Sequence, residues 1–137
     1  MVDVNNHLEV KALSESCQIL SDTLNKVEKN IFPGQSVIEL DKIAEDYIIS
    51  CNAKPAFKGY EGFPASLTVS IDDEIVHGIP KDIILKEGQI ISIDCGVIKN
   101  DFYSDSARTI AIGKISDEKQ NLLDVTKKAL DLSLIHI

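Results

Sequence analysis

The sequence QIISIDCGVIKNDFYSDSARTIAI, which runs from Gln89 to Ile112, predicts two antiparallel β-strands joined by a tight turn. Each strand carries one aspartate among apolar residues, Asp94 in the first and Asp105 in the second. If the turn falls at Lys99-Asn100, these two residues lie directly opposite each other on one face of the sheet, with Cβ atoms roughly 4.5–5.5 Å apart. A four-residue loop would keep that register, whereas a three-residue loop would place the two carboxylates on opposite faces.

Two carboxylates that face each other repel unless a proton or a cation lies between them. Asp94 and Asp105 are therefore candidates either for a shared proton, with one raised pKa, or for a divalent metal ion or a pair of bridged ions. The alternative is structural, with one aspartate in a turn and the other a solvated charge at a strand end. The spacing alone leaves both interpretations open.

A histidine and an aromatic loop are further candidates. His77 follows a short apolar run, and Gly78 and Pro80 after it would fix the backbone and aim the ring. It is a candidate catalytic group, although a histidine beside apolar residues can also be a packed core or edge residue. The loop GYEGFP at residues 59–64 brings two glycines and two aromatic rings together, as an apolar ligand would require, or forms an ordinary turn with its rings in the core.

Apolar periodicity predicts two helices ahead of the sheet. The first ends at Pro33-Gly34 and has one apolar stripe at steps of three and four. This stripe comprises Val10, Leu13, Cys17, Leu20, Leu24, Val27 and Ile31. The second helix opens at Ser36, where Ser36 and Glu39 have the spacing of a capping box. Its predicted buried face comprises Leu40, Ile43, Ala44, Tyr47 and Ile48.

Alternation of apolar and polar residues then predicts the strands. A half-buried strand is expected at 67–71, a short return strand at Ile75–His77, and the hairpin strands at 89–98 and 102–112. A last helix begins near Ser116, where acidic residues suit the positive end of the helix. Its apolar face would comprise Leu122, Leu123, Val125, Ala129 and Leu130.

Composition excludes several classes of protein. The chain has 137 residues and a formal net charge of −8, which fits one globular domain and argues against binding to a nucleic-acid backbone. Three cysteines without a C-x-x-C pair, and an N-terminus without a signal peptide, favour the reducing cytoplasm. No apolar run is long enough to span a bilayer, so no membrane partner is expected.

Five segments in order and spacing resemble type I methionine aminopeptidases. They are GYEGFPAS at 59–66, VHGIP at 76–80, LKEG at 85–88, SIDCG at 92–96 and YSDSA at 103–107. The resemblance runs from about Leu8 to Asp131 and implies an α+β pita-bread fold, an antiparallel sheet with flanking helices in two pseudo-symmetric halves. Residues 1–131 would form the N-terminal half of the catalytic domain and the opening of the second half.

The resemblance also implies the chemistry and the site. Asp94 would be a bidentate ligand of one divalent metal ion and Asp105 would bridge two ions, which could be cobalt, manganese, iron or zinc. His77 would hydrogen-bond the substrate and steady the charge that develops on the scissile carbonyl. The methionine side-chain pocket would be lined by Tyr60, Phe63 and Thr68.

The implied reaction is hydrolytic removal of the initiator methionine from nascent chains whose next residue is small. The protein would be a cytoplasmic monomer whose partner is the N-terminal methionine of a peptide, and a contact with the ribosome is compatible with this role. Two alternatives stay open. Ser104–Thr109 also resembles the corresponding strand of Xaa-Pro aminopeptidases and prolidases, and a pita-bread domain could serve as a non-catalytic protein-binding module.

Two departures from the family concern the end of the chain. The family's remaining ligands, one histidine and two glutamates, and a second active-site histidine would follow Asp131, so we expect the 137-residue chain to be inactive by itself. The last six residues, LSLIHI at 132–137, are what CTGTCTCTTATACACATC encodes, and that DNA matches the end of a transposase-based sequencing adapter. We therefore expect the natural sequence to differ after Asp131.

Overall fold

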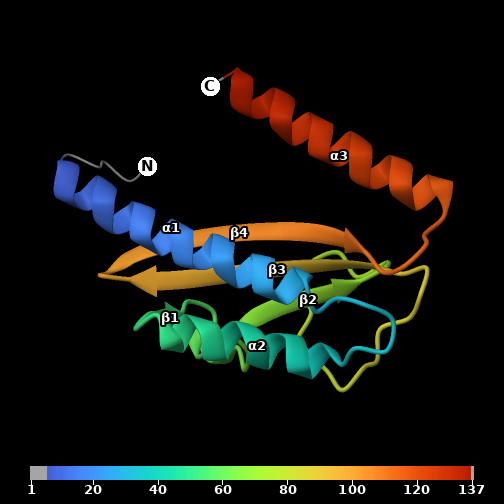
Figure 1. Cartoon of the computed structure of the whole chain (residues 1–137), viewed down its shortest axis with the longest axis horizontal. Coiled ribbons are helices and arrows are strands. Elements are labelled where there is room, and N and C mark those ends of the chain that lie inside the picture. Colours follow the sequence, from blue (N-terminus) through green and yellow to red (C-terminus); the bar gives the residue numbers. More distant parts are fainter. Residues whose placement is uncertain (1–5, 137) are drawn as a thin grey trace.

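The computed structural model describes residues 6–136 and contains three long helices and a four-stranded antiparallel sheet. The helices α1 (His7–Glu28) and α2 (Val37–Ser50) cover one face of the sheet, and α3 (Asp117–Ile135) stands apart from it (Figure 1). The α+β prediction of an antiparallel sheet with flanking helices is therefore confirmed. The predictions that concern the first five residues and Ile137 lie outside the described residues.

The sheet is built around its longest central strand. β3 (Ile90–Lys99) pairs along one side with β1 (Lys54–Pro55) and β2 (Leu67–Ile71) and along the other with β4 (Phe102–Ala111). Alternate residues of β3 are buried against the helices, so the residues between them face the opposite surface. The core between helices and sheet includes Leu24, Val27, Leu40, Ile48, Leu67, Ile91, Ile93, Cys95 and Val97.

The buried face of α1 differs from the predicted apolar stripe. Val10 is 52% exposed and Cys17 is exposed, whereas the polar Ser16 and Thr23 are buried. Both hydroxyls find backbone acceptors, since Ser16 Oγ donates to Val97 O at 3.1 Å and Thr23 Oγ1 donates to Ile19 O at 2.7 Å. Burying a hydroxyl group costs little free energy when it is hydrogen-bonded, so α1 packs a partly polar face against the sheet.

The predicted capping box of α2 is wrong. Ser36 is the N-cap residue, but its side chain makes no capping hydrogen bond. The Glu39 carboxylate instead accepts from Gln35 Nε2 at 2.8 Å. Because Gln35 competes for the glutamate, the reciprocal pair does not form.

The predicted return strand at Ile75–His77 is also wrong. Ile75 is 88% exposed and Val76 is 65% exposed, and the segment is a loop. His77 has φ +60°, a left-handed conformation that does not continue a strand. The chain turns earlier, at Asp72 with φ +52°, and the Glu74 carboxylate accepts from Ile71 N at 3.0 Å.

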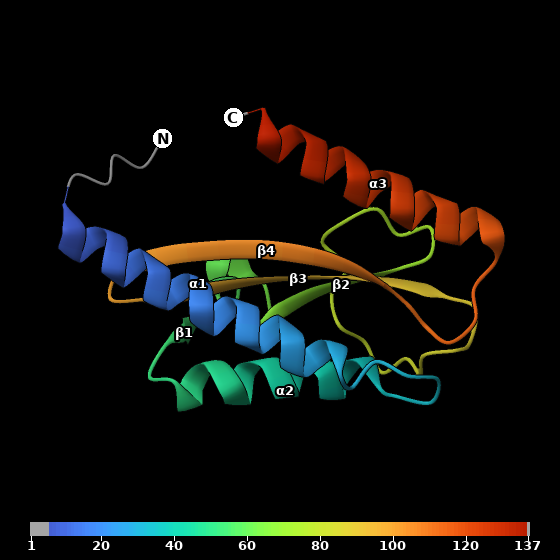
Figure 2. The same cartoon turned by 45° about the horizontal axis from the view of Figure 1, so that its top comes forward.

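The last helix is attached only near its start. Ser116 Oγ accepts from Lys119 N at 3.3 Å, and Lys119 Nζ donates to Asp72 Oδ1 and Gly88 O at 2.7 Å each. No residue of α3 between Asp117 and Ile135 is buried. Of its predicted apolar face, Leu122, Val125, Ala129 and Leu130 are exposed and Leu123 is half-buried. The helix itself stands apart from β4 (Figure 2). Residues 132–135 continue this helix, and their origin from an adapter stays a prediction.

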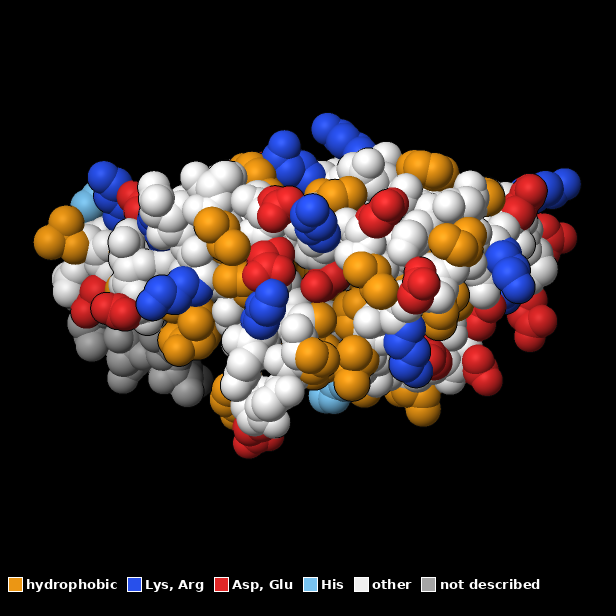
Figure 3. Space-filling view, turned by 90° about the horizontal axis from the view of Figure 1, so that it is seen from below, with side chains coloured by type: hydrophobic (Ala, Val, Ile, Leu, Met, Phe, Trp, Pro, Cys, Tyr) orange, Lys and Arg blue, Asp and Glu red, His pale blue; other side chains and the backbone are white. Residues whose placement is uncertain are grey.

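Charge and hydropathy of the described residues agree with the composition. None of the helices within 6–136 is long and apolar enough to cross a membrane. On the face seen in Figure 3, Lys and Arg side chains alternate with Asp and Glu and form no basic stripe.

Candidate metal and substrate site

The hairpin turn lies one residue later than predicted. Asn100 and Asp101 form the two-residue turn with φ +52° and +64°, and Lys99 pairs with Phe102. Asparagine and aspartate tolerate the left-handed region better than lysine does, and a two-residue hairpin turn of this type needs it at both positions. The predicted turn at Lys99-Asn100 is therefore wrong by one residue.

This shift changes how the two aspartates meet. Asp94 pairs with Ala107, and Asp105 pairs with Gly96, so the predicted direct pair is wrong. Moving a turn by one residue moves the partner strand by two, which preserves the face. Asp94 and Asp105 are thus diagonal neighbours on the sheet surface that faces away from α1 and α2.

The environment of Asp94 is unfavourable for an isolated carboxylate. Burial, followed by the nearby Asp105, raises the pKa of Asp94 to about 6, while the backbone N–H of Cys95 and the charge of His77 act in the opposite direction. Asp94 Oδ1 is buried and has no hydrogen-bond partner among the described residues. A buried carboxylate oxygen without a partner, next to a second carboxylate, can serve as a ligand to a divalent cation.

Cys95 adjoins Asp94 but does not belong to the site. Its side chain is buried on the core face, and burial raises the pKa of the thiol to about 12. Since a protonated buried thiol is a poor metal ligand, the two aspartates are the ligands that this hairpin offers.

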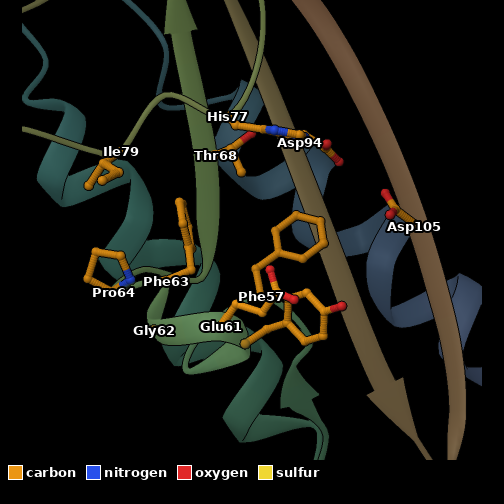
Figure 4. A pocket seen from close by; sticks show the side chains of 11 residues that line it. Phe57, Glu61, Gly62, Phe63, Pro64, Thr68, His77, Ile79, Asp94 and Asp105 are labelled. Carbon is orange, nitrogen blue, oxygen red and sulfur yellow. The ribbon is translucent and has the colours of Figure 1, made fainter.

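The backbone around His77 is held tightly against β2. Gly78 O accepts from Val69 N at 2.8 Å, and Gly78 N donates to Ser70 Oγ at 3.3 Å. A Cβ atom on Gly78 would lie 2.0 Å from Val69 O, so only glycine permits this approach. The loop therefore places His77 beside Thr68 and Asp94, as Figure 4 shows.

All six candidate residues from the sequence line one cavity of about 560 Å³. These residues are Tyr60, Phe63, Thr68, His77, Asp94 and Asp105. The cavity is also lined by Glu61, Gly62 and Pro64 of the predicted ligand loop, and by Phe57 and Ile79, which the sequence did not assign to the site. The roles of these residues in binding and catalysis stay predictions.

Phe57 is the most informative of the added residues. A Cβ atom on Gly96 would lie 2.8 Å from Phe57 Cε1, so the ring packs on the bare backbone of β3. Gly96 is the residue that pairs with Asp105, which places the ring next to the candidate metal site. In the sequence, the feature that could have indicated this contact is the single glycine Gly96 within a strand, since such a glycine often marks the close approach of another group.

Within residues 6–136, no group of three or more His, Cys, Asp or Glu side chains is placed to hold a metal ion. Asp94 and Asp105 therefore form a two-carboxylate part of a candidate site.

Comparison with known proteins assigns the family. Residues 11–136 match the model of metallopeptidase family M24. The chain belongs to this family. Its name implies divalent metal ions, and the two aspartates provide ligands of the right kind. The resemblance that the sequence motifs indicated is confirmed.

Relatives of this M24 chain are about twice its length. It is 48% identical to a methionine aminopeptidase of Clostridium acetobutylicum over 130 residues, which cover 94% of this chain and 52% of the relative. It is also 48% identical to a methionine aminopeptidase of Borreliella burgdorferi, covering 89% of this chain and 49% of that protein. The chain thus spans about half the length of the curated relatives it matches.

Solved structures confirm the pita-bread fold. A methionine aminopeptidase from Thermotoga maritima superposes with a TM-score of 0.91 at 30% identity, over 96% of this chain and 53% of that one. A prolidase from Pyrococcus furiosus superposes with a TM-score of 0.79 at 21% identity, over 90% of this chain and 35% of that one. The second likeness concerns the fold alone.

Proposed function

We propose that the full-length protein is a methionine aminopeptidase that hydrolyses the peptide bond after an N-terminal methionine, using two divalent metal ions. The observation that carries the proposal is the pair Asp94 and Asp105 on one sheet face, with a buried carboxylate oxygen that lacks a partner, at the wall of an aromatic cavity. The names of the relatives support the same activity.

Asp94 and Asp105 would hold the metal ions together with ligands from the rest of the full-length protein. When bound, divalent ions in such sites lower the pKa of water and polarise the carbonyl oxygen. His77, fixed by the Gly78 contact with β2, would donate a hydrogen bond to the substrate carbonyl and stabilise the charge that develops there.

The cavity suits a methionine side chain. Phe57, Tyr60 and Phe63 contribute aromatic surface, and a thioether gains from contact with aromatic rings. Thr68 pairs with Asp94 across β2 and β3, so a side chain that reaches Thr68 leaves its own peptide group near the carboxylates. The proposed substrate is the initiator methionine of nascent chains in the cytoplasm, processed by a monomer.

The test is a peptidase assay of the full-length protein after chelation and return of manganese, cobalt, iron or zinc. We expect release of methionine from a Met-Gly-Ser peptide and little hydrolysis of an Xaa-Pro peptide. Asp105→Asn should lower kcat/KM by about 10³-fold or more, because it removes a carboxylate ligand. The matched control is Asp101→Asn in the turn, where φ is +64° and asparagine is equally suited.

Preference for Xaa-Pro peptides would instead assign a prolidase-type activity to the same fold. Absence of hydrolysis with every metal would contradict the enzyme proposal and favour the non-catalytic binding module.

A further inference from the structure

Helix α2 presents two carboxylates, one turn apart, to the segment that forms the pocket. Asp41 Oδ1 accepts from Ser66 N at 2.9 Å and from Leu67 N at 2.8 Å. Glu45 Oε1 forms an ion pair with Lys58 Nζ at 2.6 Å. Residues four apart lie on the same face of a helix, so the two side chains reach the two ends of residues 58–67.

The segment between these two attachments is a closed unit with little packing of its own. Gly59 N donates to Phe63 O at 2.8 Å, Phe63 N donates to Tyr60 O at 2.8 Å, and Tyr60 N donates to Phe57 O at 3.0 Å. Residues 59–62 are nonetheless exposed, whereas Phe57 before the segment packs on Gly96 and residues 65–67 at its end are buried, so the core does not hold the tip of the unit. Its position relative to the sheet therefore depends on its two ends.

The exit of the segment leads directly to the candidate metal site. Leu67 pairs with Cys95 and Thr68 with Asp94, which makes Asp41 the anchor of the strand at the point where the pocket meets the carboxylates. The entry is held by the exposed Lys58–Glu45 pair, and such pairs contribute little. Asp41 is the stronger attachment because one oxygen accepts from two backbone N–H groups.

We propose that Asp41 is a positioning residue for the substrate pocket, which acts by fixing the Ser66-Leu67 backbone and thereby the place of Tyr60 and Phe63 relative to Asp94. The proposal rests on the proposed function for its kinetic consequence, whereas its structural part stands on the two hydrogen bonds. Burial raises the pKa of Asp41, and the two backbone donors act in the opposite direction.

Two substitutions separate the geometry of the acceptor from its charge. Asp41→Asn keeps an oxygen at the same place and removes the charge. Asp41→Glu keeps the charge and displaces the oxygens by one methylene group. Asp46→Glu on the exposed side of the same helix is the matched control for the added methylene.

Amide hydrogen exchange of the 137-residue chain is the first measurement, because it does not depend on catalysis. We expect Asp41→Glu to speed exchange at Ser66 and Leu67 by about tenfold or more while amides in the centre of β3 stay protected. Asp41→Asn and Asp46→Glu should leave both amides within about twofold of the unsubstituted chain. Unchanged exchange in Asp41→Glu, or faster exchange in Asp41→Asn to the same extent, would overturn the proposal.

Steady-state kinetics of the full-length protein is the second measurement. Asp41→Glu should raise KM for a Met-Gly-Ser peptide about tenfold and change kcat less than about threefold, because the pocket moves and the metal ligands do not. Asp41→Asn should restore KM to within about twofold of the unsubstituted enzyme. A lower kcat at unchanged KM would contradict a positioning role. If the unsubstituted enzyme is inactive, the proposed function fails, and the exchange measurement still decides whether Asp41 fixes the segment.

Discussion

At the residue scale, Asp94 connects burial, charge and the candidate metal site. Its carboxyl group lies on a strand whose neighbours are buried, with Asp105 as a diagonal neighbour and one oxygen without a partner among the described residues. Without metal, the folded protein therefore keeps this carboxyl group protonated up to a higher pH than a free aspartate, and a bound cation would favour the carboxylate instead. A single side chain thus links metal occupancy to protonation.

The raised pKa of Asp94 predicts a pH dependence of stability. Its pKa is about 6 in the folded chain and near 4 in the unfolded chain, so the folded state binds more protons between these values. The stabilisation is fully present below about pH 4 and is lost as the pH rises through 6. Because solvent reaches the group, we expect a loss of about 1 kcal/mol between pH 4.5 and pH 7.5 in the metal-free chain.

Urea unfolding of the chain and of its Asp94→Asn variant across that pH range measures this contribution. The difference in unfolding free energy between the two should change with pH in favour of the variant at pH 7.5, since the amide carries no charge. A constant difference would show that Asp94 does not titrate as described.

At the element scale, the hairpin shows what a sequence pattern predicts well. The predicted strands match both observed strands to within one residue at their ends, because β3 buries alternate residues against the helices and β4 pairs with β3 along its length. The turn was predicted one residue early. Its position depends on which two neighbouring residues tolerate a positive φ, and this is a small local preference that the alternating pattern does not contain. The shared face of Asp94 and Asp105 survived this error only because side chains alternate with a period of two.

Other elements were mispredicted for reasons that a linear pattern does not carry. Ser16 is buried because a carbonyl 81 residues later accepts its hydrogen bond, which no periodicity indicates. The segment Ile75–His77 begins with two apolar residues, as a strand would, but the close contact of Gly78 with Val69 gives it a different backbone path. The two-residue strand β1 and the ring of Phe57 over Gly96 depend on tertiary contacts in the same way.

The turn itself offers a test of the observed register. Asp101 has φ +64°, a conformation that glycine adopts at lower cost, and Asn-Gly is the preferred pair for this turn. Asp101→Gly should therefore raise the unfolding free energy by roughly 0.5–1 kcal/mol, measured by urea unfolding. Lys99→Gly is the contrasting variant and should destabilise, since Lys99 is a strand residue paired with Phe102. The reverse order would favour the turn at Lys99-Asn100.

At the scale of the whole molecule, α3 is the helix that packs least against the rest of the described residues. It has no buried residue between Asp117 and Ile135, and Leu122, Val125 and Leu130 are 56%, 57% and 59% exposed. An exposed apolar face of this kind is typical of a surface that packs against another surface.

Removal of residues 116–137 should therefore cost little. We expect the unfolding free energy of residues 1–115 to lie within about 1 kcal/mol of the 137-residue value, because only the Lys119 contacts near the helix start are lost. Binding of a hydrophobic dye should fall, since the exposed leucines are gone. A loss of several kcal/mol would show that α3 packs against the sheet in solution.

The most direct test of a metal site on the hairpin is the anomalous scattering of manganese in crystals of the full-length protein. We expect two peaks in the cavity, with carboxylate oxygens of Asp94 and Asp105 at about 2.0–2.6 Å and Asp105 in contact with both ions. Peaks away from these two side chains, or aspartates on opposite faces of the sheet, would contradict it.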